Sequence, residues 1–107
     1  MSIEQADVVD IVHVDRESGA IVLTLIDNLD WDPSCDGEHL LMLQEKLNTY
    51  LRFIESGELL QHYPTYQGRK IVISVACAHP LNDLARGFYS RAKSQIGDAG
   101  IELQTIE

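Results

Sequence analysis

The sequence predicts a two-layer sandwich of the α+β or α/β class. Its elements follow the order ββαβαβ and form a four-stranded mixed sheet with two helices on one face. Three observations lead to this prediction. Short β-branched runs alternate with longer segments whose apolar residues recur every three or four positions. Glycine and proline separate these segments. The 107 residues suffice to bury one hydrophobic core, so we expect a single domain over residues 1–107.

The first two predicted strands form a hairpin. Residues 8–14 (VVDIVHV) and 20–26 (AIVLTLI) are short and rich in β-branched side chains, which favours strands over helices. The polar connection between them ends in Gly19, which tolerates a positive φ. We therefore expect these two strands to pair in the antiparallel sense.

The clearest helix comes next. Apolar residues within 40–54 recur at helical spacing and predict one buried face. Ser34 or Asp36 is placed to cap its N-terminus, and Gly57 is placed to end it. Residues 59–60 predict one more helical turn after that glycine.

The second half of the chain repeats the pattern of strand, helix and strand. Residues 70–78 (KIVISVACA) are apolar on both faces, which is typical of a central strand that ends before Pro80. Residues 81–96 have helical apolar spacing, and Gly100 ends that helix. Residues 101–106 predict a short last strand.

The connections between these elements predict the topology. Each strand–helix–strand unit is expected to be a right-handed crossover between parallel neighbours. Two crossovers that step in one direction place both helices on the same face and give the strand order 1-2-3-4. The sequence leaves open whether the last strand lies at the edge or is inserted between two others.

Alternation along the strands divides their side chains into two faces. The bulkier set, expected under the helices, is Val9, Ile11, Ile21, Leu23, Leu25, Ile71, Ile73, Val75, Cys77, Ile101 and Leu103. The opposite face is still rich in Val, Ile and Ala, and soluble monomers rarely expose such a surface. We therefore expect a homodimer or a protein partner to cover it, with an interface at Val12, Val14, Val22, Thr24, Ser74 and Ala76. The alternative is that long loops cover this face.

One edge of the predicted sheet is a candidate ligand site. In open α/β sheets, ligands bind outside the carboxyl ends of the parallel strands. The candidate binding residues at that edge are Asp27, Asp30, Trp31, Asp32 and His79. Carboxylates, an imidazole and an indole together suit a cation or a small polar ligand. The alternative is a solvated acidic loop in which Trp31 closes the edge of the core.

The motifs predict no catalytic residue, no metal centre and no cofactor. Asp32-x-Ser34-x-Asp36-Gly37 copies the first half of an EF-hand loop, but the twelfth position is Leu43 instead of glutamate. A weak surface Ca²⁺ or Mg²⁺ site is the remaining metal alternative. The sequence has no nucleophile elbow and no glycine-rich phosphate loop.

The charge of the chain limits its partners. The net charge is −9, and thirteen of the 17 acidic residues lie in residues 1–60. Such a surface repels nucleic acid and anionic membranes, so we expect neither as a partner. No apolar run is long enough for a membrane span, and the N-terminus does not resemble a signal peptide. Two widely separated cysteines are typical of a reduced, cytoplasmic chain.

Three motifs resemble a known group of sequences. They are Asp27-x-x-Asp30-Trp31, Phe53-Ile54-Glu55-Ser56-Gly57 and Gly68-Arg69-Lys70. The stretch from residue 8 to about residue 75 is similar to small bacterial single-domain proteins of unknown function. The resemblance implies a free-standing bacterial domain and brings no established activity or catalytic residue.

These observations lead to one principal functional hypothesis and two alternatives. The principal hypothesis is a non-enzymatic, acidic, cytoplasmic protein-interaction module that self-associates. The first alternative is a small-ligand or metal-dependent enzyme that uses Asp27, Asp30 and His79 at the carboxyl edge. The second alternative is an immunity-type inhibitor whose carboxylates fill the active site of a basic toxin.

Overall fold

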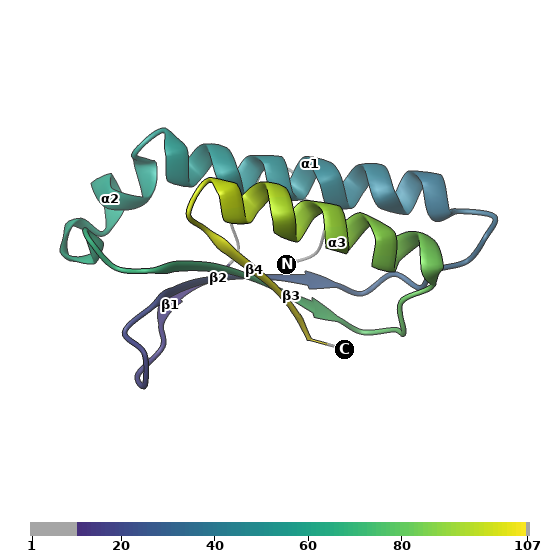
Figure 1. Ribbon diagram of the computed structural model, residues 1–107, viewed down its shortest axis with the longest axis horizontal. Coiled ribbons are helices and arrows are strands. Elements are labelled where there is room, and N and C mark those ends of the chain that lie inside the picture. Colours follow the sequence, from purple (N-terminus) through teal and green to yellow (C-terminus); the bar gives the residue numbers. More distant parts are fainter. Residues whose placement is uncertain (1–10, 107) are drawn as a thin grey trace.

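The computed structural model describes residues 11–106. These residues form four strands, three α-helices and one 3₁₀ helix (Figure 1). In chain order the elements are β1 (Ile11–Val14), β2 (Ile21–Asp27), α1 (Asp36–Glu55), α2 (Glu58–His62), η1 (Pro64–Tyr66), β3 (Ile71–Cys77), α3 (Asp83–Asp98) and β4 (Glu102–Ile106). The first three residues of the predicted first strand, residues 8–10, lie outside the described part of the chain.

The sheet has the predicted topology. Its order is β1-β2-β3-β4, with β1 antiparallel to β2 and β3 parallel to both of its neighbours. The last strand therefore lies at the edge and is not inserted between others. Figure 1 shows α1 and α3 on the same side of the sheet, as right-handed crossovers that step in one direction require. The two-layer α/β sandwich is confirmed.

Local signals in the sequence set the ends of the helices. Gly57 follows α1 with a φ of 88°, the left-handed conformation that a glycine adopts without strain. Asn82 caps α3, because its Oδ1 accepts a hydrogen bond of 2.9 Å from the backbone N–H of Ala85. The end of α1 agrees with the boundary expected from the sequence, whereas the cap of α3 was not predicted.

The predicted cap of α1 is wrong. Cys35 occupies the cap position and makes no side-chain capping bond. Ser34 instead donates its hydroxyl to Asp32 Oδ1 at 2.9 Å, and Asp36 is already the first helical residue. The Asp36 Oδ2 accepts a hydrogen bond of 3.0 Å from Asn82 Nδ2, which links the starts of α1 and α3. Both candidate caps are therefore used in other hydrogen bonds.

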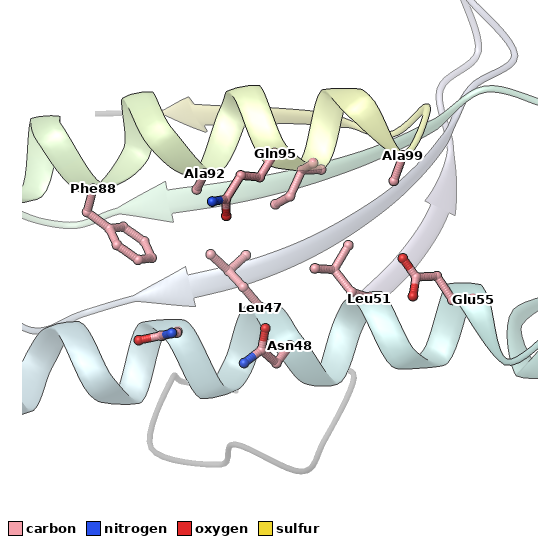
Figure 2. A pocket seen from close by; sticks show the side chains of 10 residues that line it. Leu47, Asn48, Leu51, Glu55, Phe88, Ala92, Gln95 and Ala99 are labelled. Carbon is pink, nitrogen blue, oxygen red and sulfur yellow. The ribbon is translucent and has the colours of Figure 1, made fainter.

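The helix layer consists mainly of α1 and α3, which run in the same direction. Figure 2 shows this arrangement: from Leu47 to Glu55 and from Phe88 to Ala99 the two helices advance side by side. A shallow groove lies between them, and side chains of both helices line it.

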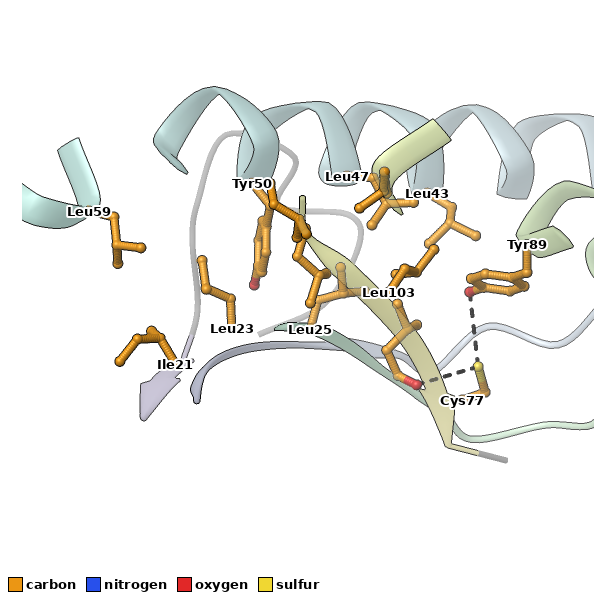
Figure 3. Close-up of a cluster of buried hydrophobic side chains, with 14 residues drawn as sticks. Ile21, Leu23, Leu25, Leu43, Leu47, Tyr50, Leu59, Cys77, Tyr89 and Leu103 are labelled. Atoms are coloured by element: carbon orange, nitrogen blue, oxygen red, sulfur yellow. Dashed lines mark hydrogen bonds between the residues drawn. The ribbon is translucent and has the colours of Figure 1, made fainter. Parts of the chain in front are cut away.

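The main core lies between the helix layer and the sheet (Figure 3). Leu23 and Leu25 of β2 and Ile73 and Val75 of β3 are fully buried there. Their alternation with less buried neighbours confirms which face of these two strands meets the helices. Tyr50 of α1 reaches the same core, as Figure 3 shows.

The face assigned to Val12 and Val14 is wrong. Val12 pairs with Leu23, and Val14 pairs with Ile21. Directly opposed residues of paired strands share a face, so these two valines pack against the main core and not on the uncovered face. In the run VVDIVHV, apolar residues occupy both odd and even positions. Alternation alone therefore does not decide which of its side chains face the helices. The hairpin register decides it, and Ile11 pairs with Thr24.

Candidate functional site

The carboxyl ends of β2 and β3 meet at the edge where the sequence places a candidate site. Asp27 ends β2 and lies directly beside Cys77, which ends β3. The backbone N–H of Ala78 donates to the Asp27 carbonyl oxygen at 2.9 Å. The two loops that follow these strands therefore leave the sheet side by side.

The side chain of Asp27 is the centre of this edge, and it is buried with only 1% exposed. Its carboxylate lies 2.6 Å and 2.8 Å from Nε2 of His39, which extends from the first turns of α1. It also accepts a hydrogen bond of 3.2 Å from the backbone N–H of Leu29. His39 is 2% exposed, so the pair lies inside the protein.

Hydrogen bonding fixes how many protons the Asp27–His39 pair holds. Nδ1 of His39 lies 3.1 Å from the carbonyl oxygen of Asp30, and a carbonyl only accepts, so Nδ1 carries a proton. A second proton lies between Nε2 and the Asp27 carboxyl group. The pair is therefore either an imidazolium with a carboxylate or an imidazole with a carboxylic acid. Both forms have no net charge, which is what allows the pair to be buried.

Trp31 covers this pair. Its ring stacks on the His39 ring, with 3.6 Å between centroids and 17° between planes. Trp31 is itself only partly exposed and packs against the main core. Because Asp27 is 1% exposed, a ligand reaches its carboxylate only after neighbouring side chains move. In this arrangement the indole closes the edge of the core, as the alternative reading of the acidic loop expected.

The structure divides the five sequence-predicted binding residues into two groups. Asp27 and Trp31 meet around His39, and Asp30 joins them through its backbone carbonyl while its own side chain is exposed. Asp32 and His79 are exposed. Ser34 donates its backbone N–H and its hydroxyl to Asp32, and these hydrogen bonds lower the pKa of that carboxyl group.

Sequence reasoning missed His39 and Tyr89 at this site. His39 precedes Leu43 and Leu47 at helical spacing of four, so it lies on the buried face of α1. Tyr89 likewise follows Ala85 by four positions on the buried face of α3. The spacing was therefore sufficient to place both side chains against the sheet, although it does not reveal the partners that they find there.

Tyr89 of α3 reaches the end of β3 from the same helix layer. Its hydroxyl lies 3.9 Å from the sulfur of Cys77, a contact drawn in Figure 3. The thiol of Cys77 is directed to the backbone oxygen of Val75 at 3.8 Å. Burial raises the pKa of Tyr89 far above the ordinary tyrosine value, with further contributions from Cys77 and Asp27. The phenol therefore stays protonated inside the protein.

The raised pKa of Tyr89 leads to a prediction for alkaline solution. In the unfolded chain a tyrosine ionises with a pKa of about 10, while folded Tyr89 keeps its proton. The stability from this group is complete below about pH 10 and falls above it by about 1.4 kcal/mol per pH unit. We expect Tyr89→Phe to lose stability less steeply between about pH 10 and 11.5 than the wild type, measured by urea unfolding.

Tyr63→Phe is the control for this prediction, because Tyr63 is exposed to solvent. Its stability profile should follow that of the wild type. Parallel profiles for Tyr89→Phe and the wild type would contradict the prediction.

The site is a group of polar side chains buried at the edge of the core, and not an open pocket. Within residues 11–106, no group of three or more histidine, cysteine, aspartate or glutamate side chains is arranged to hold a metal ion. The acid–base pair sits under an aromatic ring and holds the loop 28–35 against α1. The hydrogen bonds of this pair therefore serve to hold the loop and the helix together.

Comparison with known proteins places the sequence in a family. A family model matches residues 1–106. The chain belongs to a family of unknown function, DUF6572. This agrees with the expected resemblance to small proteins of unknown function, and the family description brings no activity to the site. No curated protein and no solved structure matches the chain.

A helix of this DUF6572 member would need about 20 consecutive, mainly apolar residues to cross a bilayer. Every helix within the described residues is too short or too polar for such a span.

Proposed function

We propose that this chain is a non-enzymatic, cytoplasmic protein-interaction module that pairs with a second copy of itself through the uncovered face of its sheet. The observation that supports this proposal is the one-sided helix layer in Figure 1. The opposite face of β2, β3 and β4 carries small and β-branched side chains. We call it the open face, and it contains Val22, Thr24, Ile26, Val72, Ser74, Ala76, Glu102, Gln104 and Ile106.

The two halves of the open face differ in what they offer to a partner. At the amino half, Val22 and Val72 pair with each other and form a small apolar cluster with Ala20 that is already buried. Ser74 is 2% exposed, and the Gln104 amide donates to its hydroxyl at 3.2 Å. These residues gain little from a further covering layer.

The carboxyl half holds the apolar surface that remains exposed. Ile26, Ala76 and Ile106 lie in one row across β2, β3 and β4. Ile106 is 55% exposed, and Ile26 and Ala76 are partly exposed. Thr24 lies beside this row. A flat row of this kind suits face-to-face packing of two sheets, whose backbones then lie about 10 Å apart.

Charge favours contact between two copies at the open face over contact elsewhere on their surfaces. With a net charge of −9, two identical chains repel each other over most of their surface. The only acidic side chain of β2, β3 and β4 on the open face is Glu102, and Lys70 pairs with it at 3.1 Å. The row of Ile26, Ala76 and Ile106 carries no charge. It is therefore a region where two copies meet with little electrostatic penalty.

The buried state of the polar edge supports an interaction module over an enzyme. Asp27 and His39 satisfy each other under Trp31, whereas an acid or base that acts on substrate needs to reach it. Asp30 and His79, the other two residues considered for catalysis, have exposed side chains on separate loops.

The test of this proposal is a charge placed in the centre of the row. Wild-type protein should form a concentration-dependent dimer, which light scattering after size exclusion detects as a rise in mass. Ala76→Asp buries one uncompensated carboxylate from each copy, and we expect it to weaken the dimer about 100-fold or more. Ser90→Asp adds the same charge to the exposed surface of α3 and should leave the dimer intact.

Two results would argue against self-association. One is a wild-type chain that remains a monomer at millimolar concentration. The other is a dimer that Ala76→Asp and Ser90→Asp affect equally, since this would place the contact elsewhere.

A further inference from the structure

The groove between α1 and α3 is a cavity of about 170 Å³ on the side of the sheet opposite to the open face. Figure 2 shows its lining side chains, which come from both helices. Leu47 and Leu51 of α1 and Phe88, Ala92 and Ile96 of α3 supply its apolar surface. An apolar cavity of about 150 Å³ holds one benzene molecule, so this groove has the size for a single aromatic ring.

The groove is polar at its margins. Gln44, Asn48 and Gln95 contribute primary amides, which both donate and accept hydrogen bonds. Glu55 contributes the single charged side chain of the lining. This carboxylate forms no ion pair with any residue of the described range 11–106. The one full charge that a ligand meets in the groove is therefore negative.

The direction of the two helices strengthens this negative end. Both run from the Phe88 side toward Glu55 and Ala99, so both C-termini lie at the same end of the groove (Figure 2). A helix C-terminus carries a partial negative charge that favours cations. The last turn of α3 has no basic side chain, and Arg52 of α1 donates to Thr49 and does not line the groove.

We propose that this groove binds a small apolar amine, with its ring between Leu51 and Ile96 and its ammonium group beside Glu55, one helical turn beyond Leu51. The ring replaces water on the apolar surface of the two helices. The ammonium group lies at the end where a carboxylate and two helix C-termini coincide. A neutral or anionic ligand of the same shape lacks the second interaction. The site is independent of the open face, because the sheet separates them.

The probe for this site is phenethylamine, with 2-phenylethanol as its neutral isostere and 3-phenylpropanoate as an anionic analogue. Titration into ¹⁵N-labelled protein should shift the signals of groove residues, including the side-chain amides of Gln44, Asn48 and Gln95. For a ligand of this size we expect a dissociation constant of about 1 mM for the amine. The alcohol should bind about three to five times more weakly, and the anion more weakly still.

Two variants locate the binding. Glu55→Gln should weaken phenethylamine about three- to fivefold and leave 2-phenylethanol unchanged. Glu58→Gln removes the same charge from α2, outside the groove, and should bind the amine as the wild type does. Ala92→Leu fills the groove and should weaken all three compounds at least tenfold, with circular dichroism to confirm that it folds.

The ligand series on wild-type protein decides the proposal even if a variant does not fold. Equal binding of the amine and the alcohol would overturn it. Shifts that map away from the groove, or no saturable shift at about 20 mM amine, would overturn it as well.

Discussion

Replacing His39 with alanine should lower the free energy of unfolding by about 3–5 kcal/mol, because it removes one partner of a buried, hydrogen-bonded acid–base pair. The carboxyl group of Asp27 would remain inside the protein without its 2.6 Å contact to Nε2. The Asp30 carbonyl would lose its hydrogen bond, and Trp31 would lose the ring on which it stacks. Urea unfolding followed by circular dichroism near neutral pH measures this loss.

Asp27→Asn is the informative counterpart to this substitution. An asparagine amide placed at Oδ2 donates to Nε2 of a neutral His39, and its oxygen still accepts from Leu29. Every hydrogen bond of the site is then satisfied, so we expect a loss of less than about 1 kcal/mol. His79→Ala, at an exposed position, should change stability by less than about 0.5 kcal/mol. A loss below about 1 kcal/mol for His39→Ala would contradict the role assigned to the pair.

Replacing Tyr50 with alanine should have an effect of similar size, about 3–5 kcal/mol. The Tyr50 ring is fully buried between α1 and β2 and belongs to the main core. Its removal leaves a cavity in the main core, between α1 and the sheet. The same unfolding measurement detects the change, and the loss should appear as a lower midpoint with little change in slope.

Tyr50→Phe separates the ring from its hydroxyl. The hydroxyl donates to the Thr24 carbonyl oxygen at 3.0 Å, so phenylalanine keeps the volume and removes one hydrogen bond. We expect a loss of about 1 kcal/mol for this variant. A loss of stability for Tyr50→Phe as large as that for Tyr50→Ala would contradict this division. The hydrogen bond, and not the packing of the ring, would then hold α1 on β2.

The architecture was predictable because its signals are local. The alternating apolar residues of β2 and β3, the helical spacing in α1 and α3 and the stop at Gly57 each act over a few residues. The right-handed crossover rule then orders the strands without further information. The face of β1 was not predictable in this way, since Val12 and Val14 are placed by the register of the hairpin with β2.

The candidate site was predictable in position but not in composition. The ends of β2 and β3 had to meet at one edge, which placed Asp27 and Trp31 correctly. The partner of Asp27 comes from α1, twelve residues further along the chain, and depends on how that helix sits over the sheet. No rule of residue spacing predicts the contact between Asp27 and His39, because Asp27 lies in a strand and His39 in a helix, and the two elements have different periods.

The parallel pairing of β2 with β3 has a consequence for how the protein is made. Ile21 finds its neighbour Ile71 about 50 residues later, so β2 leaves the ribosome long before its partner exists. At 5–20 residues per second, the delay is on the order of 3–10 s. During that time one edge of an apolar strand has unpaired backbone groups, which invites pairing with other nascent chains. The local hairpin with β1 pairs the other edge of β2, and acidic residues on either side repel similar chains.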